Sequence, residues 1–241
     1  MSNEDSDNRK AIWEAAVNDD WEVVKQWLRF DPSLIDVIGD VVTGKSEFSQ
    51  MTLLHLAAAW NSDVEVLKFL VSQGINIKSN AFGRTPLHFA ATQNSNVEIL
   101  RYLISLGFDV DERSDFRQTP LHWAARNNPN VEILEYLVSV GAKVNASDKL
   151  GVKPLHVAAR YNPSIEVIQY LVSQCDDVDV KDAEGRTSLH LAAQSNSNIE
   201  ILKYLISLGA DVKTKDVKGR TPLDVANSEE KKRVLLDRML E

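Results

Sequence analysis

A six-residue motif recurs six times along the chain at nearly constant spacing, and this recurrence constrains the fold more than any other feature. The copies read TLLHLA, TPLHFA, TPLHWA, KPLHVA, TSLHLA and TPLDVA, and they begin at Thr52, Thr85, Thr119, Lys153, Thr187 and Thr221. Successive copies are 33 residues apart once and 34 residues apart four times. A period of this size predicts a linear array of small units, each packed against its neighbours.

One period carries the signals of two helices and a loop. Thr119 and Pro120 indicate the start of a short helix, because a hydroxyl can cap a helix and the first turn does not need the N–H that proline lacks. A second helix is predicted after Asn130, where apolar residues recur at helical spacing, and Gly141 indicates its end. The segment AKVNASDKLG that follows is interpreted as an extended arm with a tight turn at residues 148–151.

This pattern resembles the ankyrin repeat in its Thr-Pro-Leu-His signature and its period. The resemblance covers nearly the whole chain from about Ile12 and implies an all-α ankyrin-repeat solenoid of stacked antiparallel helix pairs joined by β-hairpin-like loops. We expect a disordered acidic tail at 1–8 and a single repeat domain at 9–241. The expected parts of that domain are an N-terminal cap at 9–38, an insertion hairpin at 39–50, repeats at 51–83, 84–117, 118–151, 152–185 and 186–219, and a C-terminal cap at 220–241.

The terminal units depart from the motif. Trp13 and Asp224 stand in the slot that histidine fills in the full repeats. A terminal repeat needs a polar outer face to stay soluble, so we expect the charged side chains of the last segment to face water. These side chains are Glu229, Lys231, Lys232, Arg233 and Arg238.

All histidines of the chain occupy one slot of the repeat, which raises the hypothesis of a metal-binding row. Stacked helices lie ~8–10 Å apart, whereas the ligands of one zinc ion each come within ~2 Å of it, so the row cannot share a metal. We therefore expect each imidazole to hydrogen-bond the backbone of its own turn and to tie neighbouring hairpins together. The residues are His55, His88, His122, His156 and His190.

Cys175 is the single cysteine, so no internal disulfide can form. It stands where other repeats have glycine after the second helix, at Gly74, Gly107, Gly141 and Gly209. A left-handed conformation is costly for any residue with a Cβ atom. We therefore predict a strained or rearranged helix end at Cys175.

Residues 39–46, GDVVTGKS, fit the pattern of a phosphate-binding loop. Such a loop works between a strand and a long helix, but here the next helix belongs to the Thr52 repeat. A nucleotide-binding enzyme built on this loop therefore stays only as the alternative function. The acidic run from Asp176 is not a calcium loop, because Lys181 stands where a ligand is needed. We expect no catalytic residue, no cofactor and no metal.

Composition disfavours two classes of partner, nucleic acid and membrane. The net charge of −8 disfavours nucleic acid, and no stretch approaches the ~20 apolar residues of a membrane helix. The expected protein is a cytoplasmic monomer that binds another protein.

The resemblance also implies where that partner binds, since ankyrin proteins as a family use hairpin tips and the exposed side of the first helices, which line a concave groove. Phe82, Phe116 and Tyr161 occur there on consecutive repeats, and aromatic residues often dominate interfaces. Trp123 shares its slot with smaller apolar residues and is expected in the core. The candidate contact residues are Trp60, Phe82, Arg84, Gln93, Asp115, Phe116, Gln118, Arg126, Asn127, Lys149, Leu150, Arg160, Tyr161, Glu184, Arg186 and Gln194.

Overall fold

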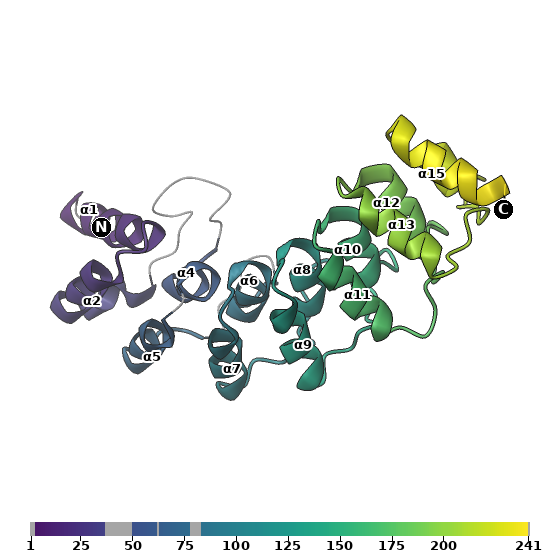
Figure 1. Cartoon of the computed structure of the whole chain (residues 1–241). Coiled ribbons are helices and arrows are strands. Elements are labelled where there is room, and N and C mark those ends of the chain that lie inside the picture. Colours follow the sequence, from purple (N-terminus) through teal and green to yellow (C-terminus); the bar gives the residue numbers. More distant parts are fainter. Residues whose placement is uncertain (1–2, 37–49, 62, 78–82, 241) are drawn as a thin grey trace. The chain divides into compact units, whose positions relative to one another are not determined.

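A computed structural model of the chain describes residues 3–36, 50–61, 63–77 and 83–240 (Figure 1). The phosphate-loop pattern at 39–46, most of the expected insertion hairpin and Phe82 lie outside these residues. Contacts between Cα atoms divide the chain into two compact units, Met1–Asp115 and Phe116–Glu241. Within the described ranges no strand is assigned, and the regular elements are helices.

The first unit is built from helix pairs. Within it α1 packs against α2 and α4, the first helices α4 and α6 lie side by side, and so do the second helices α5 and α7. The elements are α1 (Asn3–Val17), α2 (Trp21–Phe30), the 3-10 helix η1 (Pro32–Asp36), α4 (Leu53–Trp60), α5 (Val64–Ser72), α6 (Pro86–Gln93) and α7 (Val97–Ser105).

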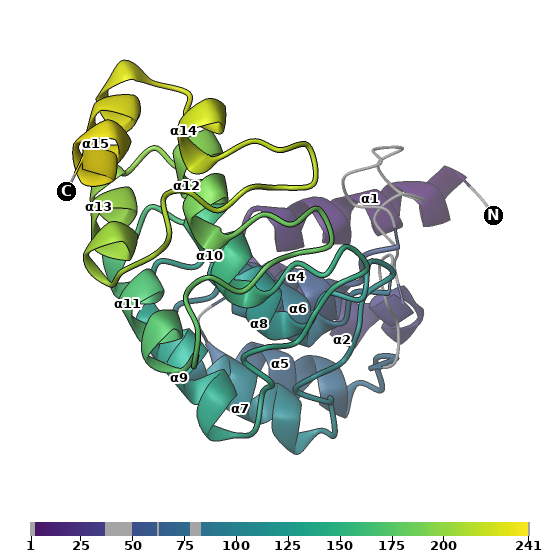
Figure 2. The same ribbon diagram turned by 90° about the vertical axis from the view of Figure 1, so that its right-hand side faces the viewer.

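The second unit repeats the same arrangement. First helices α8, α10, α12 and α14 form one row and second helices α9, α11, α13 and α15 form another, and the hairpin loops project beyond the first-helix row (Figure 2). The bounds are α8 (Pro120–Asn127), α9 (Val131–Ser139), α10 (Pro154–Tyr161), α11 (Ile165–Ser173), α12 (Ser188–Ser195), α13 (Ile199–Ser207), α14 (Pro222–Val225) and α15 (Glu229–Leu240).

The N-terminal residues correct one expectation. Helix α1 begins at Asn3, so the prediction of a disordered tail at 1–8 is wrong for residues 3–8. Two features explain the helix. Arg9 donates to Asp5 at 3.2 Å, a pairing one helical turn apart, and Ile12 and Trp13 are buried and hold the helix on the core.

An asparagine at the end of first helices α6, α10 and α12 ties each of them to the preceding repeat, a feature that the sequence analysis missed. The side-chain amide of Asn162 donates to the carbonyl oxygens of Ala125 at 3.1 Å and of Asn128 at 2.9 Å. Asn94 and Asn196 make the equivalent pairs of bonds within their own units. Buried carbonyl groups are costly when unpaired, so these amides are part of the inter-repeat contact.

Lys231 ends this series in the second unit. Its Nζ donates to the carbonyl oxygens of Ala192 at 3.0 Å and Ala193 at 3.1 Å, and to Oδ1 of Asn227 at 2.8 Å. Burial lowers the pKa of Lys231. The expectation that Lys231 faces water is therefore wrong: it is 4% exposed, and it donates to Ala193 O, which matches the alanine carbonyls that asparagine side chains cover in the preceding repeats.

The helix end at Cys175 is rearranged rather than strained. After Gly141, which has a φ of 104°, the N–H of Ala142 donates to Leu137 O at 2.9 Å. Cys175 does not have a positive φ, and Asp176 is exposed where Ala142 is buried. The sequence prediction offered both outcomes, and the backbone takes the second because a Cβ atom disfavours the left-handed conformation.

Candidate partner-binding face

The histidine slot organises the start of each full repeat's first helix. Nδ1 of His122 accepts the N–H of Thr119 at 3.2 Å and lies 2.9 Å from its hydroxyl oxygen. Because Nδ1 accepts, the proton is on Nε2, which donates to Val152 O at 3.1 Å in the next hairpin. In the last unit Asp224 takes the same place, and its Oδ2 accepts from Thr221 N and Oγ1, both at 2.8 Å. The predicted structural role of the histidines is confirmed.

Burial disfavours the charged form of three of these imidazoles. Burial lowers the pKa of His55 to about 4, and it also lowers the pKa values of His156 and His190. Within the described residues no group of three His, Cys, Asp or Glu side chains could hold a metal ion. The hydrogen bonds to the helix starts and to the following hairpins give the row its role in the fold.

Aspartates fix the hairpin loops of the second unit. Oδ1 of Asp182 accepts the N–H of Arg186 at 2.9 Å, and Oδ2 accepts its Nε at 2.8 Å. Asp216 makes the same bonds with Arg220. Burial raises the pKa of Asp216, but hydrogen bonds from the backbone and side chain of Arg220 and from the backbone of Lys218 bring it down to about 2. Arg186, a candidate contact residue, is thus engaged inside its own loop.

Neighbouring tips of the second unit are joined through their backbones. Lys149 N donates to Phe116 O at 3.1 Å, and Ala183 N donates to Leu150 O at 3.0 Å. Gln118 Nε2 donates to Asp148 Oδ2 at 3.2 Å, which adds a side-chain link between the first two of these loops. The tips therefore present their side chains from a fixed backbone.

Arg117 departs from the later hairpins of the second unit, which have glycine at the matching position. Its φ is 61°, in the left-handed region that Gly151, Gly185 and Gly219 occupy in the following hairpins. A residue with a Cβ atom there costs ~1–2 kcal/mol. The hairpin keeps its geometry and displays an arginine beside Phe116.

Exposed apolar groups gather on the tips and first helices of the second unit. Phe116 is 67% exposed, Leu150 58% and Tyr161 43%. The guanidinium groups of Arg126 and Arg160 lie over the ring of Tyr161, with Cζ 4.0 and 5.0 Å from its centroid. Trp123, expected in the core, is only partly buried.

The remaining candidates differ in their surroundings. Arg84 stacks over Phe89 with Cζ 4.8 Å from the ring centroid, and burial lowers its pKa. Glu184 pairs with Arg186 at 3.2 Å and Gln194 is partly buried. The exposed candidates beside those already named are Trp60, Gln93, Asp115, Asn127 and Lys149.

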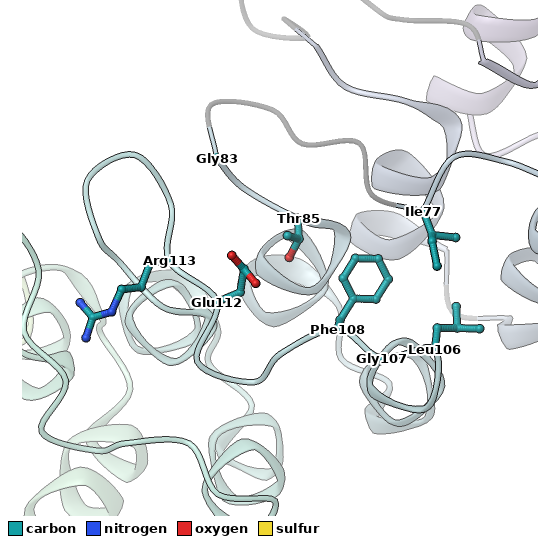
Figure 3. Close-up of a pocket in the computed structure, with 8 residues that line it drawn as sticks. All are labelled: Ile77, Gly83, Thr85, Leu106, Gly107, Phe108, Glu112 and Arg113. Carbon is teal, nitrogen blue, oxygen red and sulfur yellow. The ribbon is translucent and has the colours of Figure 1, made fainter.

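A cavity of about 320 Å³ lies among loops of the first unit (Figure 3). Ile77, Leu106 and Phe108 supply its apolar wall and Glu112 a carboxylate, while Arg113 points away from the other lining side chains. None of the candidate contact residues that the structure describes lines it.

A family model that comprises three ankyrin repeats matches the chain in four overlapping ranges, residues 12–114, 54–148, 104–182 and 155–238. The chain belongs to the ankyrin repeat family. A comparison with curated proteins found no significant match. Ankyrin repeats are in general protein–protein interaction modules, and the family is typically non-enzymatic. In the part of the chain that the structure describes, no helix is long and apolar enough to cross a membrane.

Proposed function

We propose that this ankyrin repeat protein holds a partner protein through the tips and first helices of residues 116–220 and catalyses no reaction. The observation that supports this most is the exposure of Phe116, Leu150 and Tyr161 on a backbone that hydrogen bonds already fix. A preorganised surface loses little conformational entropy on binding. Aromatic side chains that stand on such a surface supply large contact areas to a partner.

The test removes the exposed rings and measures binding to a partner captured from the native source. The variant is Phe116→Ala with Tyr161→Ala. Its matched control, Val140→Ala with Leu208→Ala, removes exposed apolar groups at the ends of second helices α9 and α13. We expect the ring variant to lose about 2 kcal/mol of affinity or more, roughly thirtyfold, while the control binds normally.

Thermal melts of both variants show that the fold is intact, since exposed positions contribute little to stability. Full-strength binding by the ring variant would place the partner elsewhere, on the second helices or on residues outside the described ranges. An equal loss in both variants would mean that the effect is not specific to this face.

The finer features of the proposal are a monomer and a cytoplasmic location. A single cysteine suits a reducing compartment. Light scattering coupled to gel filtration should give the mass of one chain, and fluorescence imaging of the tagged protein in its native cells should show cytoplasmic signal. A mass of two chains or signal confined to another compartment contradicts these points.

A further inference from the structure

Two arginines in the second unit stack on one ring. Arg126 and Arg160 lie over Tyr161 as described above. Stacking uses the flat face of a guanidinium group and leaves its N–H edge available for a planar pair of oxygens. Among the described residues no carboxylate forms a salt bridge with either arginine, whereas Arg186 and Arg220 are paired within their own loops.

Arg160 adds an independent observation. Its Nε is buried and has no hydrogen-bond partner in the described part of the chain. A buried donor without an acceptor is unfavourable, and a charged donor more so. The described part of the chain therefore supplies no acceptor for this group, and a carboxylate that pairs with the remaining N–H groups of the guanidinium would give Arg160 a charged partner.

The charge around these arginines is one-sided. Residues 116–127 and 148–161 hold five basic side chains and one acidic side chain, Asp148. Asp148 is already occupied, because its oxygens accept the N–H groups of Leu150 and Val152 and the amide of Gln118. The basic residues are Arg117, Arg126, Lys149, Lys153 and Arg160. This segment is positive within a chain whose net charge is −8.

We propose that the basic–aromatic patch formed by Phe116, Arg126, Lys149, Leu150, Arg160 and Tyr161 binds an acidic, extended peptide segment of the partner protein. Carboxylates of the segment pair with the edges of Arg126 and Arg160, and an apolar side chain packs on Phe116 and Leu150. This inference rests on the proposed function and adds the chemistry of the partner.

The dimensions of the patch fit an extended segment. The tips lie before the N-terminal ends of α8 and α10, and the arginines lie near the C-terminal ends of the same helices. A helix of eight residues is ~12 Å long, a distance that about four extended residues span. One short segment can therefore reach from the tip residues to the stacked arginines.

The experiment uses the full chain and a fluorescein-labelled synthetic peptide with four glutamates, one phenylalanine and one leucine, read by fluorescence anisotropy at low salt. A second peptide replaces each glutamate with glutamine. The protein variants are Arg126→Gln with Arg160→Gln, and Lys149→Gln alone at an exposed tip position that the fold does not need. The matched control, Lys203→Gln with Arg233→Gln, removes the same charge from α13 and α15.

We expect the glutamate peptide to bind at least about tenfold more tightly than the glutamine peptide, with an affinity that falls as salt is added. The double arginine variant should lose about tenfold, Lys149→Gln should lose less, and the control should bind as the unmodified protein does. An equal loss in the control would overturn the patch in favour of non-specific charge attraction.

Equal binding of both peptides, abolished by Phe116→Ala with Tyr161→Ala, would also overturn the acidic partner while leaving the proposed function standing. No binding of either peptide would overturn this inference alone, since the proposed function is tested separately with the captured partner. A partner that survives the double arginine substitution at full affinity would exclude the acidic segment even where peptides bind.

Discussion

The two compact units carry the same repeat but differ in charge. Met1–Asp115 has 10 Lys and Arg against 18 Asp and Glu, whereas Phe116–Glu241 has 17 of each. Leu87 and Leu121 are equally buried in the two units. The backbone N–H groups of Thr85 and Thr119 each donate to Nδ1 of the histidine three residues later. The fold thus fixes a small set of buried positions and leaves surface charge free to serve binding.

The units also differ at their outer ends. In the first unit the side-chain amide of Asn61 donates to the carboxylate of Asp19 at 3.0 Å. In the second, the ammonium of Lys231 donates to the carbonyl oxygens of Ala192 and Ala193. In both contacts a charged side chain meets polar groups of the adjoining helix pair, an accepting carboxylate in the first unit and a donating ammonium in the second.

The largest expected effect is acid sensitivity, and it should appear in both units. His55 lies in the first unit and has a pKa of about 4 when folded, against 6.5 when unfolded, while His156 and His190 in the second unit are shifted in the same direction. A depressed histidine pKa means that the unfolded state binds the proton first. The neutral, buried His55 therefore contributes its full stabilisation of the fold above pH 6.5, and this stabilisation is lost as the pH falls to about 4.

We expect His55 alone to account for roughly 3 kcal/mol of stability lost over this window. Urea denaturation at pH 7.5, 5.5 and 4.5 measures it, with hydrogen exchange to assign the loss to each unit. Asp216 does not contribute there, because a carboxyl with a pKa lowered to about 2 loses its contribution only between pH 3.8 and 2. Stability that is flat from pH 7.5 to 4.5 would contradict the buried neutral histidines.

The next effect tests whether the asparagine bonds matter equally in the two units. Asn94→Ala and Asn162→Ala each leave two buried carbonyl groups without their donor, at a cost of about 2 kcal/mol. Urea midpoints measure this, and Asn127→Ala, at an exposed position one residue before Asn128, should change stability by less than ~0.5 kcal/mol. A large loss in one unit only would show that the inter-repeat contacts are not equivalent.

Lys231→Met tests the end of the second unit. The substitution keeps an unbranched side chain but removes three hydrogen bonds, and two buried carbonyl oxygens lose a charged donor. The burial cost of the ammonium is removed at the same time, so we expect a net loss of about 1–2 kcal/mol. Lys232→Met, which disrupts an exposed ion pair with Glu229, is the control and should be nearly neutral. Equal melting temperatures for the two variants would contradict a structural role for Lys231.

The sequence predicted the repeat, the helix pairs and the histidine bonds because each depends on local signals or on a fixed spacing. It did not predict the buried Lys231. A lysine in a polar segment does not indicate that its ammonium will donate to backbone carbonyl groups 38 and 39 residues earlier in the chain. It also missed the roles of Asn94, Asn162 and Asn196, because these residues stand in short polar segments where an asparagine is common for other reasons. Among the binding candidates, the pattern could not separate Arg126, free to stack on Tyr161, from Arg186, which a buried aspartate holds.

The smallest expected effect concerns Cys175, where one repeat of the second unit differs from its neighbours. Its backbone avoids the left-handed region, so Cys175→Gly relieves no strain and adds freedom to the unfolded chain. We expect the single variant to be unchanged or less stable by up to ~1 kcal/mol. In the same repeat Nε2 of His156 bonds Val180 O, whereas His122 and His190 bond the residue before the N-cap of the next first helix.

A second variant sharpens the point. Cys175→Gly with Asp176→Ala recreates the Gly-Ala pair found at 141–142 and 209–210, where the alanine is buried and its N–H donates to the carbonyl of the second helix. The double variant should therefore adopt the regular helix end and gain about 1 kcal/mol over the single variant. The urea denaturation midpoints of the single and double variants measure this gain in stability. A gain from Cys175→Gly alone would mean that the helix end carries strain after all, and no gain from the pair would mean that the rearrangement is set by the following loop rather than by these two residues.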